Sequence, residues 1–213
     1  DVGGLSVGGV DVQPGHAQSM HRAGLGMVYQ DLSLIDTLSV SANIFLGRSP
    51  SEDGRRSPYI RAGLEVERSA ALFRRIGVPV DPEAEVGQLP LADRQIVEIA
   101  KALVVARTCL ILDEPTTALS AREIDRLFRV VGQLRDEGMG VIFITHHLQE
   151  VFQVCDEVTV LRDGVVSFRG RPAETTTSEL VRAMVAQDVP PAAVPGARAD
   201  PSAAEPLMRV RQL

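Results

Sequence analysis

Apolar and polar residues recur along this chain in two different periods. Short apolar runs bounded by turn residues are typical of β-strands. They lie at 5–12, 26–29, 109–113, 141–145, 158–161 and 165–169. Longer segments in which apolar residues recur every three or four positions indicate amphipathic helices. These segments span 40–46, 66–76, 93–105, 122–137, 148–154 and 178–186.

The alternation of strands and helices predicts an α/β fold in which a parallel sheet is flanked by helices. The most regular helix, 93–105, repeats apolar residues at the spacing of a core-facing stripe. Residues 48–63, rich in Ser, Arg, Gly and Pro, are predicted to form a loop. Residues 188–206, rich in Pro and Ala, are predicted to form a linker. We therefore expect one folded domain that ends before the linker.

The most informative strand is the one that ends in acids. Its apolar residues, 109–112, run directly into two adjacent carboxylates, Asp113 and Glu114. Such a run predicts a strand buried on both faces, with its acids at the carboxyl edge of the sheet, where open α/β sheets bind ligands. Because neighbouring side chains of a strand point to opposite faces, we expect different roles for the two acids. One can hold a hydrated Mg²⁺ while the other polarises a water, the two tasks of nucleotide hydrolysis. A buried strand that ends in an acidic turn is the plain structural alternative.

Composition and charge narrow the classes of partner. The 213 residues suffice for one ordinary domain, and 45% hydrophobic and 23% charged residues are usual for a globular protein. The net charge of −6 argues against a nucleic-acid-binding surface. Cys109 and Cys155 lack the spacing of metal ligands, so we expect small hydrophobes in a reducing compartment. No apolar run approaches the roughly 20 residues that span a bilayer.

Several motifs together resemble those of ATP-binding-cassette ATPases. Residues 109–120, Cys-Leu-Ile-Leu-Asp-Glu-Pro-Thr-Thr-Ala-Leu-Ser, are similar to the Walker B strand and D-loop. Gln30, in Met-Val-Tyr-Gln-Asp-Leu-Ser-Leu-Ile, resembles the Q-loop glutamine, and His146, in Val-Ile-Phe-Ile-Thr-His-His, the switch histidine. Residues 89–95 and the helix after them resemble the signature motif. The resemblance covers nearly the whole chain and implies a P-loop NTPase-like core with a helical subdomain at about 40–106.

Within this superfamily, three stretches resemble sugar importers of the ribose and galactose type. They are Ser-Ala-Asn-Ile-Phe-Leu-Gly-Arg (41–48), Ile-Val-Glu-Ile-Ala-Lys-Ala-Leu (96–103) and Cys-Asp-Glu-Val-Thr-Val-Leu-Arg-Asp-Gly (155–164). Those proteins carry two ATPase cassettes in one polypeptide, and residues 1–187 align with the first. Residues 207–213 resemble the opening strand of a second cassette.

A phosphate-binding loop, Gly-x-x-x-x-Gly-Lys-Ser/Thr, does not occur in the sequence. That loop supplies a backbone N–H cradle, a phosphate-binding lysine and a hydroxyl ligand for Mg²⁺. In the family it lies upstream of the stretch with which this sequence starts, and the Gly-rich residues 1–10 resemble the hairpin that follows it. We therefore expect an N-terminally truncated cassette that lacks the first strand and the phosphate loop. A natural pseudo-cassette is the alternative.

The resemblance implies a role for each residue of the expected site. Asp113 is expected to bind Mg²⁺ through water, and Glu114 to orient or deprotonate the attacking water. The Gln30 amide, donor and acceptor at once, is expected to contact Mg²⁺ and the water and to pass the nucleotide state to a membrane partner. Register against the family selects His146, and not His147, as the hydrogen-bond partner of a γ-phosphate.

The signature segment departs from the family's usual Leu-Ser-Gly-Gly-Gln and from the importers' Leu-Ser-x-Gly-x-x-Gln. Pro90 replaces the serine that would bond a γ-phosphate, and Ala92 replaces a glycine that allows close backbone approach. The helix N-terminus still offers N–H groups to an anion, so we expect a weakened half-site. The D-loop is also altered, because Ser120 stands where many members have Asp. The expected nucleotide contacts are Leu89, Pro90, Leu91, Ala92, Asp93, Arg94, Gln95, Ala118, Leu119 and Ser120.

By resemblance, the intact protein is expected to use ATP and Mg²⁺ and to couple ATP hydrolysis to monosaccharide import. Its expected partners are transmembrane sugar permease subunits, a second cassette and, indirectly, a sugar-binding protein, with no nucleic acid. Its expected location is the cytoplasmic face of the cell membrane. Without a phosphate loop this segment alone is expected to be inactive. A catalytically inactive remnant and a non-transport cassette ATPase acting on ribosomes or DNA are the alternatives.

Overall fold

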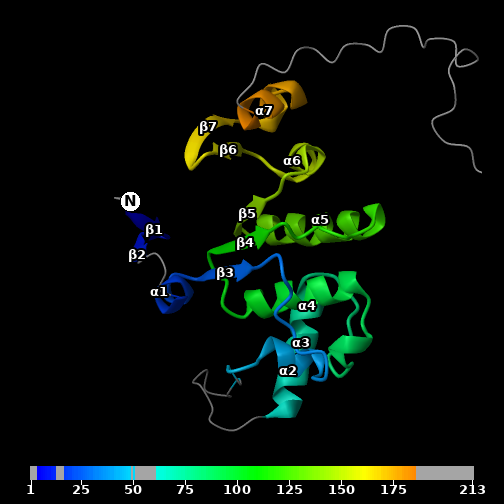
Figure 1. Cartoon of the computed structure of the whole chain (residues 1–213). Coiled ribbons are helices and arrows are strands. Elements are labelled where there is room, and N and C mark those ends of the chain that lie inside the picture. Colours follow the sequence, from blue (N-terminus) through cyan, green and yellow to red (C-terminus); the bar gives the residue numbers. More distant parts are fainter. Residues whose placement is uncertain (1–3, 13–16, 49, 51–60, 186–213) are drawn as a thin grey trace, which may run out of the picture. The chain divides into compact units, whose positions relative to one another are not determined.

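The chain divides into two compact units, residues 1–155 and 156–213, which are described separately (Figure 1). The computed structural model describes residues 4–12, 17–48, 50 and 61–185. The predicted linker at 188–206 and the predicted second-cassette strand at 207–213 lie outside the described residues.

The first unit begins with a β-hairpin. Strands β1 (Leu5–Val7) and β2 (Val10–Val12) pair antiparallel, as the apolar run at 5–12 predicts. Gly8 and Gly9 connect them with φ values of 56° and 78°. Two successive positive φ angles define the tight turn that matches the twist of paired strands, and glycine adopts them without strain. The short helix α1 (Ala17–Arg22) follows and was not predicted, because six mostly polar residues carry no apolar period.

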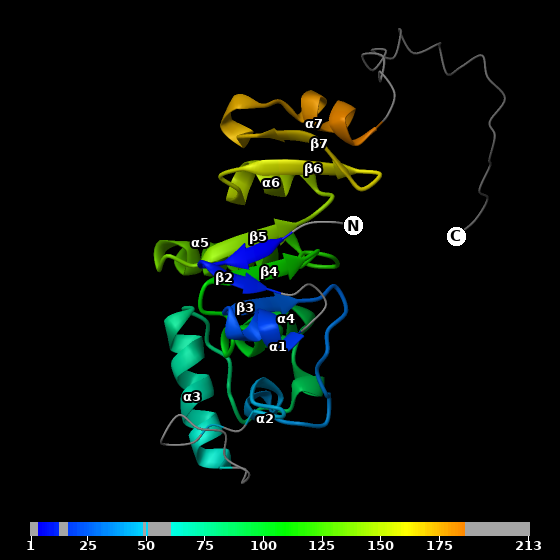
Figure 2. The same cartoon turned by 90° about the vertical axis from the view of Figure 1, so that its left-hand side faces the viewer.

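The central sheet of the first unit is parallel, as predicted. It contains β3 (Leu25–Val28), β4 (Cys109–Asp113) and β5 (Gly140–Ile144) in the order β3-β4-β5. The three strands lie side by side in this order (Figure 2). The register places Val28 beside Leu112, and Leu112 beside Phe143. All three strands therefore end at one edge of the sheet. That edge is where their following loops bring polar residues together.

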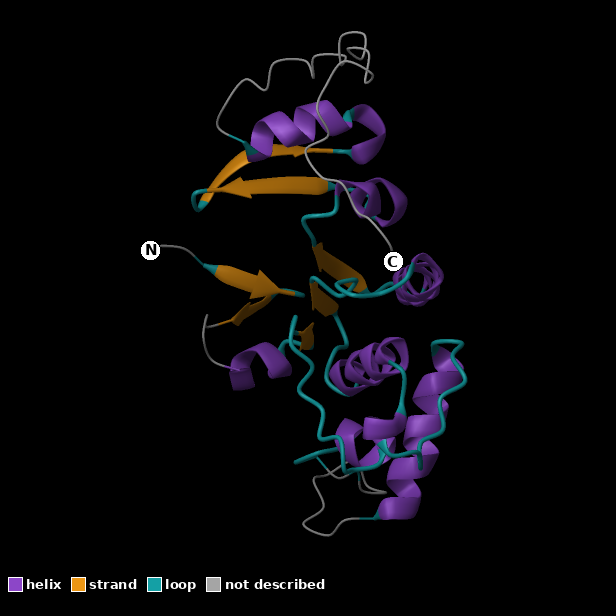
Figure 3. Ribbon diagram, turned by 45° about the vertical axis from the view of Figure 1, so that its right-hand side comes forward, coloured by secondary structure: helices purple, strands orange, loops and turns teal. Residues whose placement is uncertain are grey.

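Between β3 and β4 the chain forms the predicted helical segment (Figure 3). It comprises α2 (Val40–Ile44), α3 (Ala62–Arg75), the 3₁₀ turn η1 (Val86–Gln88) and α4 (Leu91–Leu103). Helix α3 starts four residues earlier than predicted. Ala62 and Gly63 are therefore helical and not part of the loop expected at 48–63. Residues 49 and 51–60 of that loop lie outside the described residues. Helix α4 starts two residues earlier than predicted, directly after Pro90.

The core of the first unit lies between the sheet and its helices. Helix α5 (Ala121–Asp136) buries one stripe there, and Gly26 of β3 lets α4 approach, since a Cβ at Gly26 would lie 2.8 Å from the Ala102 carbonyl oxygen. Hydrophobic burial of this kind contributes most of the driving force for folding. The largest fully buried side chains of this unit are Ile44, Ile76, Ile99, Leu110, Leu112, Leu127, Leu134, Val28, Val40, Val86 and Val97.

The two strands predicted to be buried are buried less than expected. In β4 only Leu110 and Leu112 are fully buried, whereas Cys109, Ile111 and Asp113 are half-buried. In β5 the prediction is wrong for one face, because Ile142 and Ile144 are 51% and 44% exposed. Helices α4 and α5 pack on the opposite face of this sheet, and the outer edge of β5 pairs with no strand among the described residues.

Helix α6 (Leu148–Val154) closes the first unit with the predicted bounds. The second unit contains the predicted hairpin of β6 (Val158–Arg162) and β7 (Val165–Gly170), the 3₁₀ turn η2 (Pro172–Glu174) and α7 (Thr177–Met184). The Ser167 hydroxyl donates to the Ala183 carbonyl at 2.9 Å, which ties α7 to its hairpin.

Candidate functional site

Three of the predicted site residues meet at the carboxyl edge of the central sheet. Gln30 follows β3, Glu114 follows β4 and His146 follows β5. The ring nitrogen Nδ1 of His146 lies 3.0 Å from Oε1 of Glu114, and Nε2 of Gln30 donates to Oε2 of the same carboxylate at 3.3 Å. The sequence brings these groups together because each comes directly after one of three adjacent parallel strands.

Glu114 adopts an unusual backbone conformation. Its φ is 44°, in the left-handed region that side chains other than glycine rarely occupy. Its N–H donates to the Ile144 carbonyl at 2.9 Å, so the hydrogen-bonded ladder runs one residue past the end of β4. We expected the alternation of side chains along a strand to separate the two acids. Instead, Glu114 lies outside β4, and its backbone turns away from the extended conformation of Asp113. Backbone strain of this kind is characteristic of functional positions.

Asp113 occupies the last position of β4 and is half-buried. Among the described residues neither Asp113 nor Glu114 forms an ion pair with a lysine or an arginine. Two adjacent carboxylates without a lysine or arginine partner create a negative potential that suits a hard divalent cation. The Glu114 carboxylate is 28% exposed and the His146 ring 57% exposed, so water reaches both groups.

A separate pair of hydrogen bonds fixes the turn that carries His146. The Thr145 hydroxyl donates to the buried Glu150 carboxylate at 2.7 Å and accepts from the His147 N–H at 2.9 Å. The ring of His147 stacks on that of His146, with centroids 4.1 Å apart, and makes no hydrogen bond to the described residues. His146, and not His147, is thus the histidine that contacts Glu114, and its bond to a γ-phosphate remains a prediction. Sequence reasoning missed Thr145 and Glu150, because the sequence does not show that the acid in the first turn of α6 is buried.

The D-loop continues directly from Glu114. Its residue Ala118 has a φ of 67°, and the Leu119 N–H donates to the Thr116 carbonyl at 3.0 Å. Ser120 is the N-cap of α5, and its N–H donates to the Glu123 carboxylate at 2.7 Å. Hydrogen bonds from the Ser120 side chain and N–H lower the pKa of Glu123. Ser120 thus serves to start a helix, and its predicted contact with nucleotide remains a prediction.

The signature segment uses its polar groups within the protein. Arg94 donates to the carbonyl oxygens of Gly87 at 2.6 Å and Leu89 at 3.0 Å, and Asp93 pairs with Arg126 of α5 at 2.5 Å. The N–H groups of Asp93 and Arg94 both bond the Pro90 carbonyl. Among the described residues, the N–H groups of Leu91 and Ala92 at this helix start have no hydrogen-bond partner.

The seven signature residues and the carboxyl edge of the sheet are not brought into contact. Within the described residues, no hydrogen bond or ion pair joins 89–95 to Gln30, Glu114 or His146. Gln95 is buried, at 7% exposure, and Ala92 at 8%. The predicted nucleotide contacts of this segment remain predictions.

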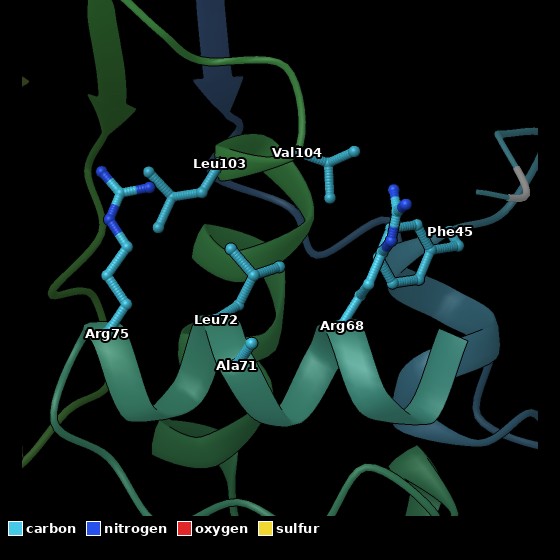
Figure 4. Close-up of a pocket in the computed structure, with 7 residues that line it drawn as sticks. All are labelled: Phe45, Arg68, Ala71, Leu72, Arg75, Leu103 and Val104. Atoms are coloured by element: carbon cyan, nitrogen blue, oxygen red, sulfur yellow. The ribbon is translucent and has the colours of Figure 1, made fainter. Parts of the chain in front are cut away.

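A cavity of about 350 Å³ lies away from these residues, against helix α3 (Figure 4). Leu72, Leu103 and Phe45 supply apolar walls, while Arg68 and Arg75 project from α3 along the same side. The cavity shares no residue with the carboxyl edge. Its apolar lining and two arginines provide no general base or metal ligand.

Other candidate features of the described residues carry little chemistry. No group of three or more His, Cys, Asp or Glu residues is placed to hold a metal ion there. Burial raises the pKa of the Cys109 thiol, which agrees with a small hydrophobe in β4. Among the described helices, none has the length and apolar character needed to span a membrane.

The parallel sheet carries an acid, a histidine and a glutamine at its carboxyl edge, and a helical insertion follows its first strand. This arrangement is typical of α/β nucleotide-binding proteins. The family comparison then makes the assignment specific. Residues 1–117, more than half of the chain, match the family described as ABC transporter. The chain belongs to this family.

Curated relatives are similar over most of the chain. Ribose import ATP-binding protein RbsA 2 of Streptomyces coelicolor is 43% identical, over 89% of this chain and 36% of the relative. Ribose import ATP-binding protein RbsA 1 of Rubrobacter xylanophilus is 42% identical, over 100% of this chain and 41% of the relative. Ribose import ATP-binding protein RbsA of Geobacillus kaustophilus is 39% identical, over 89% and 38%. The chain thus spans about two fifths of the length of these relatives.

Solved structures share the fold. CbiO1 from Clostridium perfringens, part of the ABC transporter complex cbiONQ, aligns with a TM-score of 0.65 at 23% identity, over 82% of this chain and 68% of that chain. A putative metal-chelate type ABC transporter in an inward-facing conformation aligns with a TM-score of 0.62 at 22% identity, over 76% and 63%. The predicted P-loop NTPase-like α/β fold is confirmed.

Proposed function

We propose that this chain is part of the ATP-hydrolysing subunit of an importer for a monosaccharide such as ribose. The observation that carries the proposal is the Glu114 carboxylate, held between His146 and Gln30 at the carboxyl edge of the sheet. The names of the relatives supply the substrate class, because they are ribose import ATP-binding proteins. Sugar specificity itself would reside in other subunits.

In this proposal each residue at the carboxyl edge has a distinct task. Glu114 orients the attacking water and accepts its proton, and its 28% exposure leaves room for that water. His146, 3.0 Å away, fixes the carboxylate and presents its other ring nitrogen, Nε2, to the γ-phosphate. Gln30 holds the second carboxylate oxygen through its Nε2, which leaves the amide oxygen for a metal or water.

The chemistry of the donors fits Mg²⁺. Asp113 provides a half-buried carboxylate next to Glu114, and Gln30 provides a neutral oxygen. Mg²⁺ in proteins keeps several waters and takes one or two carboxylates together with substrate phosphates, so this small donor set suffices. When bound, the ion would neutralise charge on the phosphates during transfer.

The phosphate cradle is the part of the site that this sequence does not contain. We propose that residues 1–187 form a cassette completed by a further strand and a phosphate loop. Two observations support this: the outer edge of β5 pairs with no strand among the described residues, and Ile142 and Ile144 are 51% and 44% exposed beside it. An added strand would pair with that edge and cover apolar surface, which favours association.

The remaining partners follow from the same proposal. Residues 188–206 would link this cassette to a second one that starts at 207–213, and the pair would bind transmembrane permease subunits on the cytoplasmic face of the membrane. A sugar-binding protein would deliver the substrate to the permease. The net charge of −6 accords with a protein partner and not with nucleic acid.

The test uses residues 1–213 preceded by a phosphate-loop segment of the family, called the extended protein below. Glu114→Gln keeps the shape of the side chain and removes its negative charge, so MgATP binding should persist while the hydrolysis rate falls by at least about 100-fold. Hydrolysis is measured with permease and sugar-binding protein in vesicles, with and without ribose. Hydrolysis by Glu114→Gln at the parent rate would refute Glu114 as the base, and ribose-independent turnover would refute the import function.

A further inference from the structure

A buried carboxylate outside the proposed chemistry connects the Gln30 loop to helix α4. Glu98 is 6% exposed, on a face of α4 that it shares with the polar residues Gln95 and Lys101, each about one turn away. Its Oε1 accepts a hydrogen bond from the Ser33 N–H at 2.6 Å and another from the Ser33 hydroxyl at 2.9 Å. A buried charge is retained only when donors satisfy it, and here a loop residue 65 positions away supplies them.

Lys101 completes the cluster from the same helix. Its Nζ donates to the Ser33 carbonyl at 2.8 Å and to the Ser33 hydroxyl at 2.9 Å, and lies 3.7 Å from the Glu98 carboxylate. Ser33 therefore bonds to α4 through its N–H, its hydroxyl and its carbonyl. Hydrogen bonds to charged groups are the strong ones, so this loop residue is held in one position on the helix.

Ser33 lies close to Gln30 in the chain, so the cluster restrains the loop that carries Gln30. Only residues 29–32 separate it from the end of β3, and Gln30 lies within that stretch. Gln30 thus stands between an anchor on the sheet and an anchor on α4. Beyond Ser33, the fully buried Asn43 holds Ile35 through bonds of 2.7 and 3.0 Å, so the loop cannot slide to absorb movement.

Helix α4 is also the helix that the signature segment begins. Pro90 is its N-cap, and Glu98 and Lys101 lie two and three turns further along the same rigid element. We propose that Glu98 and Lys101 are positioning residues that clamp Ser33 to α4, so that displacement of the signature helix moves Gln30 relative to Glu114. The catalytic consequence rests on the proposed function, whereas the clamp itself does not.

The clamp is tested on residues 1–213 by amide hydrogen exchange with NMR. Glu98→Ala should speed exchange of the Ser33 amide by about tenfold or more, with β4 amides unchanged, and should shift the side-chain amide resonance of Gln30. Lys101→Met, which keeps both bonds from Ser33 to Glu98, should produce a smaller increase. Glu67→Ala, an exposed acid on α3, is the matched control and should leave the Ser33 amide unchanged.

An unchanged Ser33 amide in both Glu98→Ala and Lys101→Met would overturn the clamp. Should Glu98→Ala not fold, Glu98→Gln, which keeps an acceptor oxygen, and Lys101→Met decide the question at the same amide. In the extended protein, Glu98→Ala should lower kcat for ATP with little change in KM, because Gln30 and not nucleotide binding is disturbed. An unaltered kcat overturns the positioning role. An extended protein without any hydrolysis would instead refute the proposed function, and the exchange result would still decide the clamp.

Discussion

The carboxyl edge of the sheet and the signature segment contain similar numbers of polar side chains and use them in opposite ways. Glu114, His146 and Gln30 contact one another at the surface and keep unused donors and acceptors. Asp93 instead pairs with Arg126, and Arg94 donates to backbone carbonyls. A group that already bonds the protein has less to offer a ligand, so this difference supports the proposed catalytic use of the first region and a structural use of the second, which holds α4 in place.

The largest expected effect separates the two adjacent histidines. His146→Ala removes the partner of Glu114 and should reduce the ATP hydrolysis rate of the extended protein by about 100-fold, the lower range for a positioned acid–base group. His147→Ala is the matched control, because its ring makes no hydrogen bond to the described residues, and should stay within about twofold. Steady-state phosphate release measures both. Equal losses of hydrolysis rate in the two variants would show that His146 was wrongly chosen over His147 as the catalytic histidine.

A smaller effect is expected from repairing the signature segment. Pro90→Ser with Ala92→Gly restores a hydroxyl and an open backbone, which should raise turnover about tenfold at the site that this segment completes, since a hydrogen bond to a charged group is worth about 1.5–3 kcal/mol. The experiment uses a two-cassette protein with one phosphate loop disabled at a time. The site on this cassette's own phosphate loop is the internal control. Equal responses at both sites would contradict the idea of a weakened half-site.

The structural use of the signature predicts an effect on stability. The pair of Asp93 with Arg126 has side chains only 24% and 26% exposed, so Asp93→Asn should lower the free energy of unfolding by about 1 kcal/mol. Asp136→Asn breaks the exposed pair with Arg135, with side chains 72% and 54% exposed, and should cost less than about 0.5 kcal/mol. Urea denaturation compares them. The same cost for both would mean that the signature pair is no more structural than a surface contact.

The smallest effect concerns the D-loop end of α5. Hydrogen bonds from Ser120 lower the pKa of Glu123, so ionised Glu123 stabilises the folded state above its unfolded-state pKa. That contribution is lost as pH falls through the lowered pKa. Glu123→Gln should therefore cost stability at pH 7 and progressively less as the pH is lowered through the acidic range, measured by urea denaturation at a series of pH values. If the stability cost of Glu123→Gln did not change with pH, the hydrogen bonds from Ser120 to ionised Glu123 could not be its source.

Much of the fold could be predicted from local patterns. The acid-ended strand was predicted with its observed bounds, 109–113, because a continuous apolar run bounded by turn residues has few alternatives. The family resemblance implied that Gln30, Glu114 and His146 belong to one site, and they meet because the ends of parallel strands share an edge. The strand prediction depends on an apolar run and the site prediction on local motifs, and both can be recognised within short segments of the sequence.

The parts that could not be predicted depend on contacts between distant segments. The exposure of Ile142 and Ile144 depends on what lies against the sheet, which an apolar pattern does not specify. The positive φ of Glu114 accompanies its bond to the Ile144 carbonyl, 30 residues away in sequence. The burial of Glu98 required Ser33 as its partner, and the pairing of Asp93 required Arg126. Sequence patterns identify the elements, whereas these long-range partners decide how each polar group is used.

The central claim is that this chain holds the hydrolytic edge of a nucleotide site without its phosphate cradle. Isothermal titration of residues 1–213 with MgATP tests it most directly, with the extended protein as reference. We predict a Kd of about 1 mM or weaker for residues 1–213 and micromolar affinity for the extended protein, because backbone N–H groups and a lysine supply most of the contact to phosphate. Micromolar affinity of residues 1–213 alone would contradict the account.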